Sequence, residues 1–232
     1  MSMQNTTERS EARLSSQGRD VLMKLKEMSG AGIKDCKEAL EANGGDIDKS
    51  VAYLREKGKA TAAKKQDRLA SEGAVFSYVH LGGKIGVLVE INCETDFAAK
   101  AEKFQELGKN VAMQIAASNP LYLDETQVPT EELDKEKEIL RAKAINDKKP
   151  AAVIEKMLEG QVKKYYGEIC LVHQSYVKDP SKTIKDVVTE TIAVIGEKIS
   201  IRRFVRYEMG EGLEKKSENF AEEVAKTVAV KK

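Results

Sequence analysis

The spacing of apolar residues predicts three short helices between residues 19 and 57. Two stripes repeat every three or four positions: Val21, Leu22, Leu25 and Met28, then Ile33, Cys36, Ala39 and Leu40. After the break at Asn43-Gly44-Gly45, Asp46 is placed to cap a third helix. A bundle of about 40 residues buries little surface. We therefore interpret it as a docking module, and a simple N-terminal cap on the larger domain is the alternative.

Residues 58–70 are rich in alanine, lysine and arginine, which predicts a solvated linker helix. Lys64 and Lys65 could contact RNA, but we favour a solvent-exposed helix face. From Gly73 to Cys93 the apolar period changes to two, which predicts two strands joined at Gly82-Gly83. The second strand, residues 85–91, is apolar on most of both faces, so we expect it to be central in a sheet covered by helices.

The covering helix follows directly and ends near Ser118-Asn119-Pro120. Its apolar positions are Phe104, Leu107, Val111 and Ile115. Two charged helices are then predicted at 130–145 and 151–166, and Pro150 suits the start of the second. Their apolar stripes are narrow: Leu133, Leu140 and Ala144, then Ile154, Met157, Leu158, Val162 and Tyr165. This pattern is typical of a projecting antiparallel coiled-coil hairpin.

Four further elements complete the predicted order. They are a strand at 169–173, a helix at 183–195, a strand at 199–207 with Ile201, Val205 and Tyr207 on one face, and an amphipathic helix at about 220–230. The predicted class is α+β. Residues 71–210 form a core of antiparallel sheet covered by helices, with the hairpin at about 130–166 and a C-terminal module at 211–232. The polar residues 1–18 are a disordered tail or an expression remnant, and an organellar presequence is the minority reading.

Charge and composition point to a protein partner and to no direct nucleic-acid role. The chain has 39 basic and 38 acidic residues, so a strong basic surface is missing. Aromatic residues make up 5% and tryptophan is absent, which argues against a stacking platform. No apolar run approaches the roughly 20 residues of a membrane span, and the N-terminus has no signal-peptide core. We therefore expect a cytoplasmic protein without membrane association.

Candidate chemistry is sparse, and we expect no cofactor, no metal and no enzymatic activity. Cys36, Cys93 and Cys170 are far apart, so a zinc site is not expected and a reducing compartment fits. The segment GGDIDKS at 44–50 lacks the glycine before lysine of a phosphate loop, and GAG at 30–32 lacks a third glycine. His80 and His173 could act as bases, but no nucleophile elbow accompanies them, so we interpret both as packing or surface residues.

The segment EINCETDFAAK, residues 90–100, lies at the junction of the central strand and the covering helix. Such loops often carry function. Thr95 is placed to cap the coming helix, Asp96 lies in its first turn, and Phe97 is a large apolar side chain at a corner. The plainer alternative is a capped helix start with Phe97 tucked under the sheet, and the residues alone favour it.

Several segments resemble the elongation factor Ts family. EINCETDFAAK resembles its TDF signature, and LKEMSGAGIKDCKEAL at 25–40 resembles its N-terminal signature. Further matches are VAYLREKG at 51–58, PSKTIKDVV at 180–188 and IRRFVRYEMGEGLEK at 201–215. The resemblance covers nearly everything after residue 18. Ala98 replaces the valine usual after TDF, which puts the local packing in doubt, and Lys26 stands where arginine is common.

The resemblance implies a guanine-nucleotide exchange factor for elongation factor Tu. The ubiquitin-associated-like bundle would dock on its GTPase domain through Leu25, Gly30, Gly32, Ile33, Cys36 and Lys37. The second contact would be Thr95, Asp96, Phe97 and Ala98, with Asp96 and Phe97 intruding near the magnesium and phosphate site. GDP would leave, and incoming GTP would displace the factor. Longer family members carry two core sheet units and this chain one, so pairing of two copies is a further hypothesis.

Two alternatives from other classes remain open. One is a ubiquitin-associated adaptor that needs only residues 19–57 and tolerates loss of Phe97. The other is a small hydrolase that uses Glu94 and Asp96 as a carboxylate pair, although nothing in the sequence raises the pKa of either carboxylate.

Overall fold

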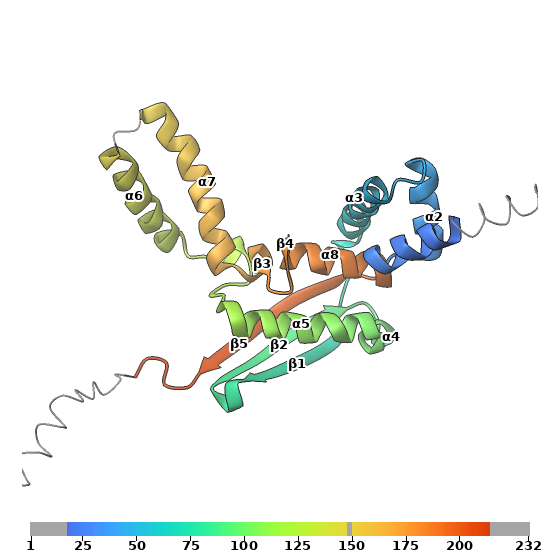
Figure 1. The fold of residues 1–232 in the computed structure, drawn as a ribbon. Helices are drawn as coiled ribbons and strands as arrows, with labels where there is room; N and C mark the ends of the chain where they lie inside the picture. The colour runs from blue at the N-terminus through green and yellow to red at the C-terminus, as the bar shows by residue number, and fades with distance from the viewer. Residues whose placement is uncertain (1–17, 148–149, 214–232) are drawn as a thin grey trace, which may run out of the picture.

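The computed structural model describes residues 18–147 and 150–213. It contains an N-terminal helical bundle, an antiparallel sheet with covering helices, and a helical hairpin that extends away from the sheet (Figure 1). The predicted α+β class is confirmed. The predicted tail at 1–18 and the predicted C-terminal module at 211–232 lie almost entirely outside the described residues.

Three helices form the N-terminal bundle: residues 18–29, α2 (Ile33–Ala42) and α3 (Ile47–Lys65). Leu25, Cys36 and Ala39 are fully buried at its centre. Asp46 caps α3 as the sequence predicts, because its carboxylate accepts a hydrogen bond from the Lys49 amide at 3.0 Å. The bundle therefore has a small apolar centre of its own.

The predicted boundary between a short third helix and a linker helix is wrong, because α3 runs without a break through Gly58. This glycine is buried, and a Cβ added to it would lie 3.3 Å from the Cβ of Ala193 on α8 (Ile184–Ile195). The missing side chain lets the two helices approach closely. One side of the segment that the sequence predicts as a solvated linker is therefore an interface between the bundle and the core, while Lys64 is exposed as predicted.

The main sheet has the order β1 (Glu72–His80), β2 (Ile85–Cys93) and β5 (Ile199–Glu208), and both pairings are antiparallel. The central place of β2 is confirmed. A 3-10 turn over Leu81–Gly83 joins β1 to β2 at the predicted glycines.

Among the described residues, helices cover one face of this sheet, in agreement with the predicted covering helix. A short helix α4 (Asp96–Lys100) precedes the long helix α5 (Glu102–Ser118). The buried α5 residues on the sheet include Phe104, Leu107, Val111 and Ile115. On the other face, five apolar side chains are exposed by 37% to 72%, and we call them the open sheet face: Val75, Val79, Leu88, Val205 and Tyr207.

A bulge in β5 explains a second wrong prediction. Ile201 pairs with Ile91 and Arg203 pairs with Glu90, so Arg202 is an extra residue in the strand. Ile201 is consequently buried, while Val205 and Tyr207 point to the open sheet face. The three side chains do not share a face.

The hairpin consists of α6 (Thr130–Asn146) and α7 (Ala151–Ile169). Its apolar contact is formed by Leu140, Ala144, Ile154 and Leu158. The strand predicted at 169–173 is wrong: α7 continues to Ile169 and a 3-10 turn follows at Leu171–His173. A short apolar run fits a buried helix end as well as a strand. A small hairpin of β3 (Ser175–Tyr176) and β4 (Asp179–Thr183) leads into α8, and the sequence does not predict it.

Candidate partner-binding surface

Residues 94–97 form a tight corner where β2 ends and α4 begins, and we call them the strand–helix corner. Thr95 is the N-cap of α4, since its hydroxyl oxygen accepts a hydrogen bond from the Ala98 amide at 3.2 Å. The capping prediction is confirmed, although the capped helix is a separate short one. Ala101 has extended backbone angles and separates α4 from α5.

Phe97 is 81% exposed, so the alternative in which it is tucked under the sheet is wrong. The reason lies in α4, whose buried side is occupied by Ala98 and Ala99. Phe97 precedes them in the turn and points to solvent. An aromatic side chain with this exposure on an ordered turn is a feature of interaction sites rather than of a folded interior.

Charges of opposite sign flank the ring. The Lys100 ammonium lies 2.7 Å from a carboxylate oxygen of Asp96 and 6.0 Å from the centre of the Phe97 ring. The pKa of Asp96 is lowered and that of Lys100 is raised, in both cases first by the hydrogen bond between them. The tip of the corner therefore presents one aromatic ring with a paired carboxylate and ammonium, all exposed.

Two carboxylates behind the tip hold the strand–helix corner against the turn after α8. Glu197 accepts hydrogen bonds from the Thr95 amide at 3.0 Å and the Thr95 hydroxyl at 2.7 Å. Glu94 accepts one from the Lys198 amide at 2.6 Å. The sequence analysis does not find Glu197, because it is separated from Thr95 by 102 positions and no local motif marks it.

The predicted docking residues divide into buried and exposed positions. Leu25 and Cys36 are fully buried and support the bundle from inside. Ile33 is 53% exposed, and Lys37 is an exposed residue whose ammonium lies 3.8 Å from the Glu41 carboxylate. The glycines shape the turn between the first two helices: Gly30 has a φ of +66°, and Gly32 is the N-cap of α2. The first helix also carries two exposed methionines: Met23, which the sequence analysis does not name, and Met28, which it places on the apolar stripe.

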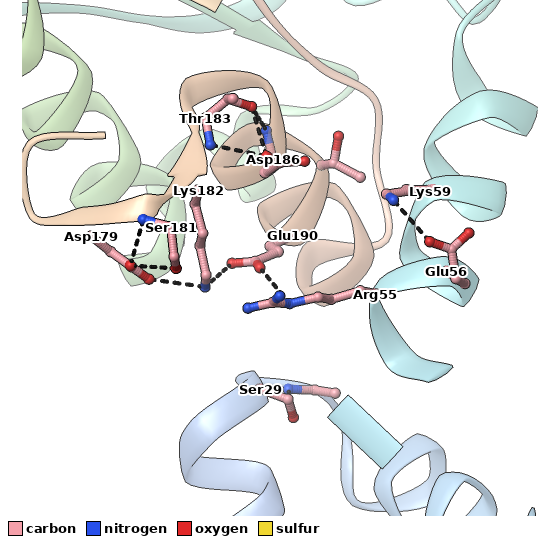
Figure 2. A network of polar contacts seen from close by, with 12 residues as sticks. Ser29, Arg55, Glu56, Lys59, Asp179, Ser181, Lys182, Thr183, Asp186 and Glu190 are labelled. Atoms are coloured by element: carbon pink, nitrogen blue, oxygen red, sulfur yellow. Dashed lines mark hydrogen bonds and ion pairs between the residues drawn. The ribbon is translucent and has the colours of Figure 1, made fainter. Parts of the chain in front are cut away.

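A chain of ion pairs joins the bundle to the core beside a cleft of about 270 Å³. Figure 2 shows Arg55 of α3 pointing to Glu190 of α8, which also pairs with Lys182. The N···O distances are 3.8 Å for Arg55 and 2.8 Å for Lys182, and Lys182 lies 3.9 Å from Asp179. These charges neutralise one another across the cleft, so we interpret them as an interface between helices.

The sequence of this chain is similar to one family of known proteins. The family model described as elongation factor TS matches residues 21–211. The chain belongs to the elongation factor Ts family. The protein named elongation factor Ts from Geotalea daltonii is 58% identical over 201 residues, which cover 87% of this chain and 93% of that protein. The relative from Desulforamulus reducens is 56% identical over 205 residues, which cover 88% of this chain and 94% of that protein. The relative from Carboxydothermus hydrogenoformans is 55% identical over 212 residues, which cover 91% of this chain and 98% of that protein.

Candidate chemistry is sparse in the described part of the chain. No three His, Cys, Asp or Glu side chains gather as metal ligands in the described part of the chain. Hydrogen bonds from Lys198 and Arg68 lower the pKa of Glu94, and Asp96 also has a lowered pKa, so neither carboxyl is held protonated as a general acid. None of the described helices is long and apolar enough to cross a bilayer.

Proposed function

We propose that this chain is a non-catalytic guanine-nucleotide exchange factor that binds elongation factor Tu and accelerates the release of GDP. Phe97, with Asp96 beside it, enters the GTPase near its magnesium and phosphate site and displaces the groups that hold the ion and the diphosphate. Thr95 and Ala98 fix the turn that carries them. No covalent bond is made or broken.

The observation that carries this proposal is the exposure of Phe97 on an ordered corner. Accelerating release about ten-thousandfold requires lowering the barrier by about 5.5 kcal/mol. An aromatic hot spot contributes about 2 to 4 kcal/mol on burial in a partner. The remaining stabilisation has to come from other contacts, so a second docking surface is required.

We assign that second surface to the N-terminal bundle, as a ubiquitin-associated-like docking module. Its exposed apolar side chains, Met23, Met28 and Ile33, offer 51% to 53% of their surfaces to a partner. Leu25 and Cys36 hold the helices that carry them, and Gly30 and Gly32 set the turn. Figure 1 shows the bundle and α4 at the same end of the molecule, with α6 and α7 at the other, so one partner can contact both.

Thermodynamic linkage sets the order of events. A factor that weakens the binding of GDP is itself bound less tightly by the GDP form, by the same ratio. The chain therefore binds the nucleotide-free GTPase most tightly, and incoming GTP displaces it.

The test measures the release of a fluorescent GDP from elongation factor Tu after addition of this protein or a variant. Phe97→Ala is expected to lower the acceleration by a factor of about 30 to 1,000. Leu81→Ala is the matched control, because Leu81 is also exposed but lies at the opposite end of β2. If the unaltered protein binds but leaves the release rate unchanged, exchange is excluded and a simple adaptor explains the bundle.

A second copy of this chain is the partner that we propose for the open sheet face. Apolar side chains of three adjacent strands are exposed there, and such a face favours a symmetric interface in which the same residues of two copies meet. Sedimentation at micromolar concentration is expected to show dimers of the unaltered protein and monomers of the Leu88→Glu variant. Ile139→Glu on the hairpin is the control, since Ile139 is also exposed but lies away from the sheet. Monomers of the unaltered protein would exclude the dimer.

A further inference from the structure

The carboxylate of Glu197 accepts hydrogen bonds from the strand–helix corner, and no feature near Glu197 in the sequence predicts this contact. One of its carboxylate oxygens accepts from the Thr95 amide and the other from the Thr95 hydroxyl. The same hydroxyl oxygen accepts from the Ala98 amide. A hydroxyl donates one hydrogen bond and accepts others, so Glu197 fixes the orientation in which Thr95 caps α4.

Glu94 makes the reciprocal contact, from the corner to the turn after α8. Its carboxylate accepts from the Lys198 amide at 2.6 Å and from the Arg68 guanidinium at 3.3 Å. Each chain segment thus supplies a carboxylate that binds a backbone amide of the other. Hydrogen bonds with a charged acceptor are about twice as strong as neutral ones. The corner and the turn over residues 196–198 are tied together twice.

The turn over residues 196–198 also contacts the helix that carries the N-terminal bundle. The Lys65 ammonium, near the end of α3, donates to the carbonyl of Gly196, which ends α8 with a φ of +81°. The Lys198 ammonium donates to the carbonyl of Arg68 at 2.7 Å. This turn therefore connects the end of the bundle's longest helix with the residues that precede Phe97.

We propose that Glu197 is a positioning residue for nucleotide exchange, which, together with Glu94, holds Phe97 at a fixed place relative to the N-terminal bundle. The inference rests on the proposed function, since the positioned group is the exposed ring. Helix α4 has five residues and little hydrogen bonding of its own, so the direction of Phe97 depends on Thr95. Without Glu197, both donors of Thr95 lose their partner and the corner can move. A displacement of about 1 Å in a group whose position matters can cost about a hundredfold in rate.

The exchange test separates positioning from docking. The release rate of fluorescent GDP is measured over a range of factor concentrations, which gives a maximal rate and a half-maximal concentration. Glu197→Ala is expected to lower the maximal rate about ten- to a hundredfold while the half-maximal concentration changes less than about threefold. Glu197→Gln keeps acceptor oxygen at the site and should recover part of the loss. The control is Glu106→Ala, which removes a carboxylate paired with Lys103 on the surface of α5.

A double substitution tests whether Glu197 acts through the ring. In a protein that already carries Phe97→Ala, the further change Glu197→Ala is expected to have almost no effect on the maximal rate. If the two effects multiply instead, Glu197 acts independently of Phe97 and the proposal is wrong.

Amide hydrogen exchange provides a readout that does not depend on elongation factor Tu. Glu197→Ala is expected to raise the exchange rates of the Ala98 and Ala99 amides at least tenfold, with rates in α5 unchanged. If these rates rise but the unaltered protein does not accelerate the release of GDP from elongation factor Tu, the positioning holds and the proposed function fails. If they do not change, Glu197 does not order the corner and the inference is overturned.

Discussion

Phe76 on β1 lies so close to Gly108 on α5 that no side-chain carbon fits between them. A Cβ built at position 108 would lie 2.3 Å from two carbons of the Phe76 ring. Both residues belong to the sheet–helix interface, and the ring is buried. The approach of α5 to the sheet therefore depends on the absence of a side chain at this position.

Gly108→Ala is expected to lower the free energy of unfolding by about 1 to 3 kcal/mol, because the core has to shift to accept the methyl group. Urea denaturation measures this difference. Gly160→Ala is the matched control: Gly160 also lies in a helix, nothing lies near its missing Cβ, and alanine there should stabilise by about 0.5 to 1 kcal/mol. Equal effects of the two substitutions would contradict the packing argument.

Gln114 is fully buried, and its side chain forms hydrogen bonds with backbone groups of the segment that leads to α8. Its amide nitrogen donates to the Ser175 carbonyl at 3.1 Å, and its oxygen accepts from the Val177 amide at 2.9 Å. Gln114→Leu leaves both groups without this partner, so we expect a loss of about 2 to 3 kcal/mol. Gln161→Leu on the exposed side of α7 should change stability by less than about 0.5 kcal/mol in the same denaturation experiment.

Glu132 fixes the base of the hairpin, since its carboxylate accepts hydrogen bonds from the Tyr122 hydroxyl at 2.6 Å and the Tyr165 hydroxyl at 2.7 Å. Glu132→Ala is expected to broaden the distribution of distances between spin labels on α6 and α5, because the hairpin loses this anchor. Glu131→Ala is the control at the neighbouring exposed position. An unchanged distribution in Glu132→Ala would show that apolar packing alone orients the hairpin.

Asp186 and Thr183 form a capping box at the start of α8. Burial raises the pKa of the Asp186 carboxyl, but hydrogen bonds from the Thr183 amide and hydroxyl outweigh it and leave the pKa below its usual value. A lowered pKa in the folded state means that the stabilisation is complete above about pH 4, the pKa of an unfolded aspartate. It is lost as the pH falls through the folded value.

Asp186→Ala is therefore expected to cost about 1 kcal/mol at pH 7, and the difference from the unaltered protein should shrink as the pH is lowered below about 4. Denaturation at a series of pH values measures it. Asp134→Ala, which removes an exposed pair with Lys137, should show a small difference at every pH. If the difference between Asp186→Ala and the unaltered protein grows in acid, the pKa of Asp186 is not lowered in the folded state.

The local elements follow from the sequence, because helix period, strand period and caps are encoded within a few residues. The stripe at Phe104 to Ile115 and the cap at Asp46 are of this kind. Contacts between distant segments are not encoded in this way. Nothing local shows that Gly58 packs on Ala193, so a helix that crosses an interface has the composition of a linker.

The same limit applies to the candidate site. The sequence places Thr95, Asp96 and Phe97 at a corner, but it does not decide whether the ring is buried. That depends on Ala98 and Ala99, which fill the space beneath α4. The carboxylate of Glu197 lies beyond any local pattern, and only the packing of α8 brings it to Thr95.

The extra residue at Arg202 decides which side chains of β5 belong to the interior. If Arg202 were instead paired as a regular strand residue opposite Glu90, strict alternation would turn Phe204 and Arg206 away from α5 and turn Val205 and Tyr207 toward it. The side chains of Arg202 and Arg203, which both pair with Glu90, would be separated as well. A gain or loss of one residue at a paired position of β5 would exchange an inner surface for an outer one, whereas the loss of Arg202 alone would leave both surfaces as they are. A one-residue gap within β5 in alignments of related chains should therefore fall at position 202.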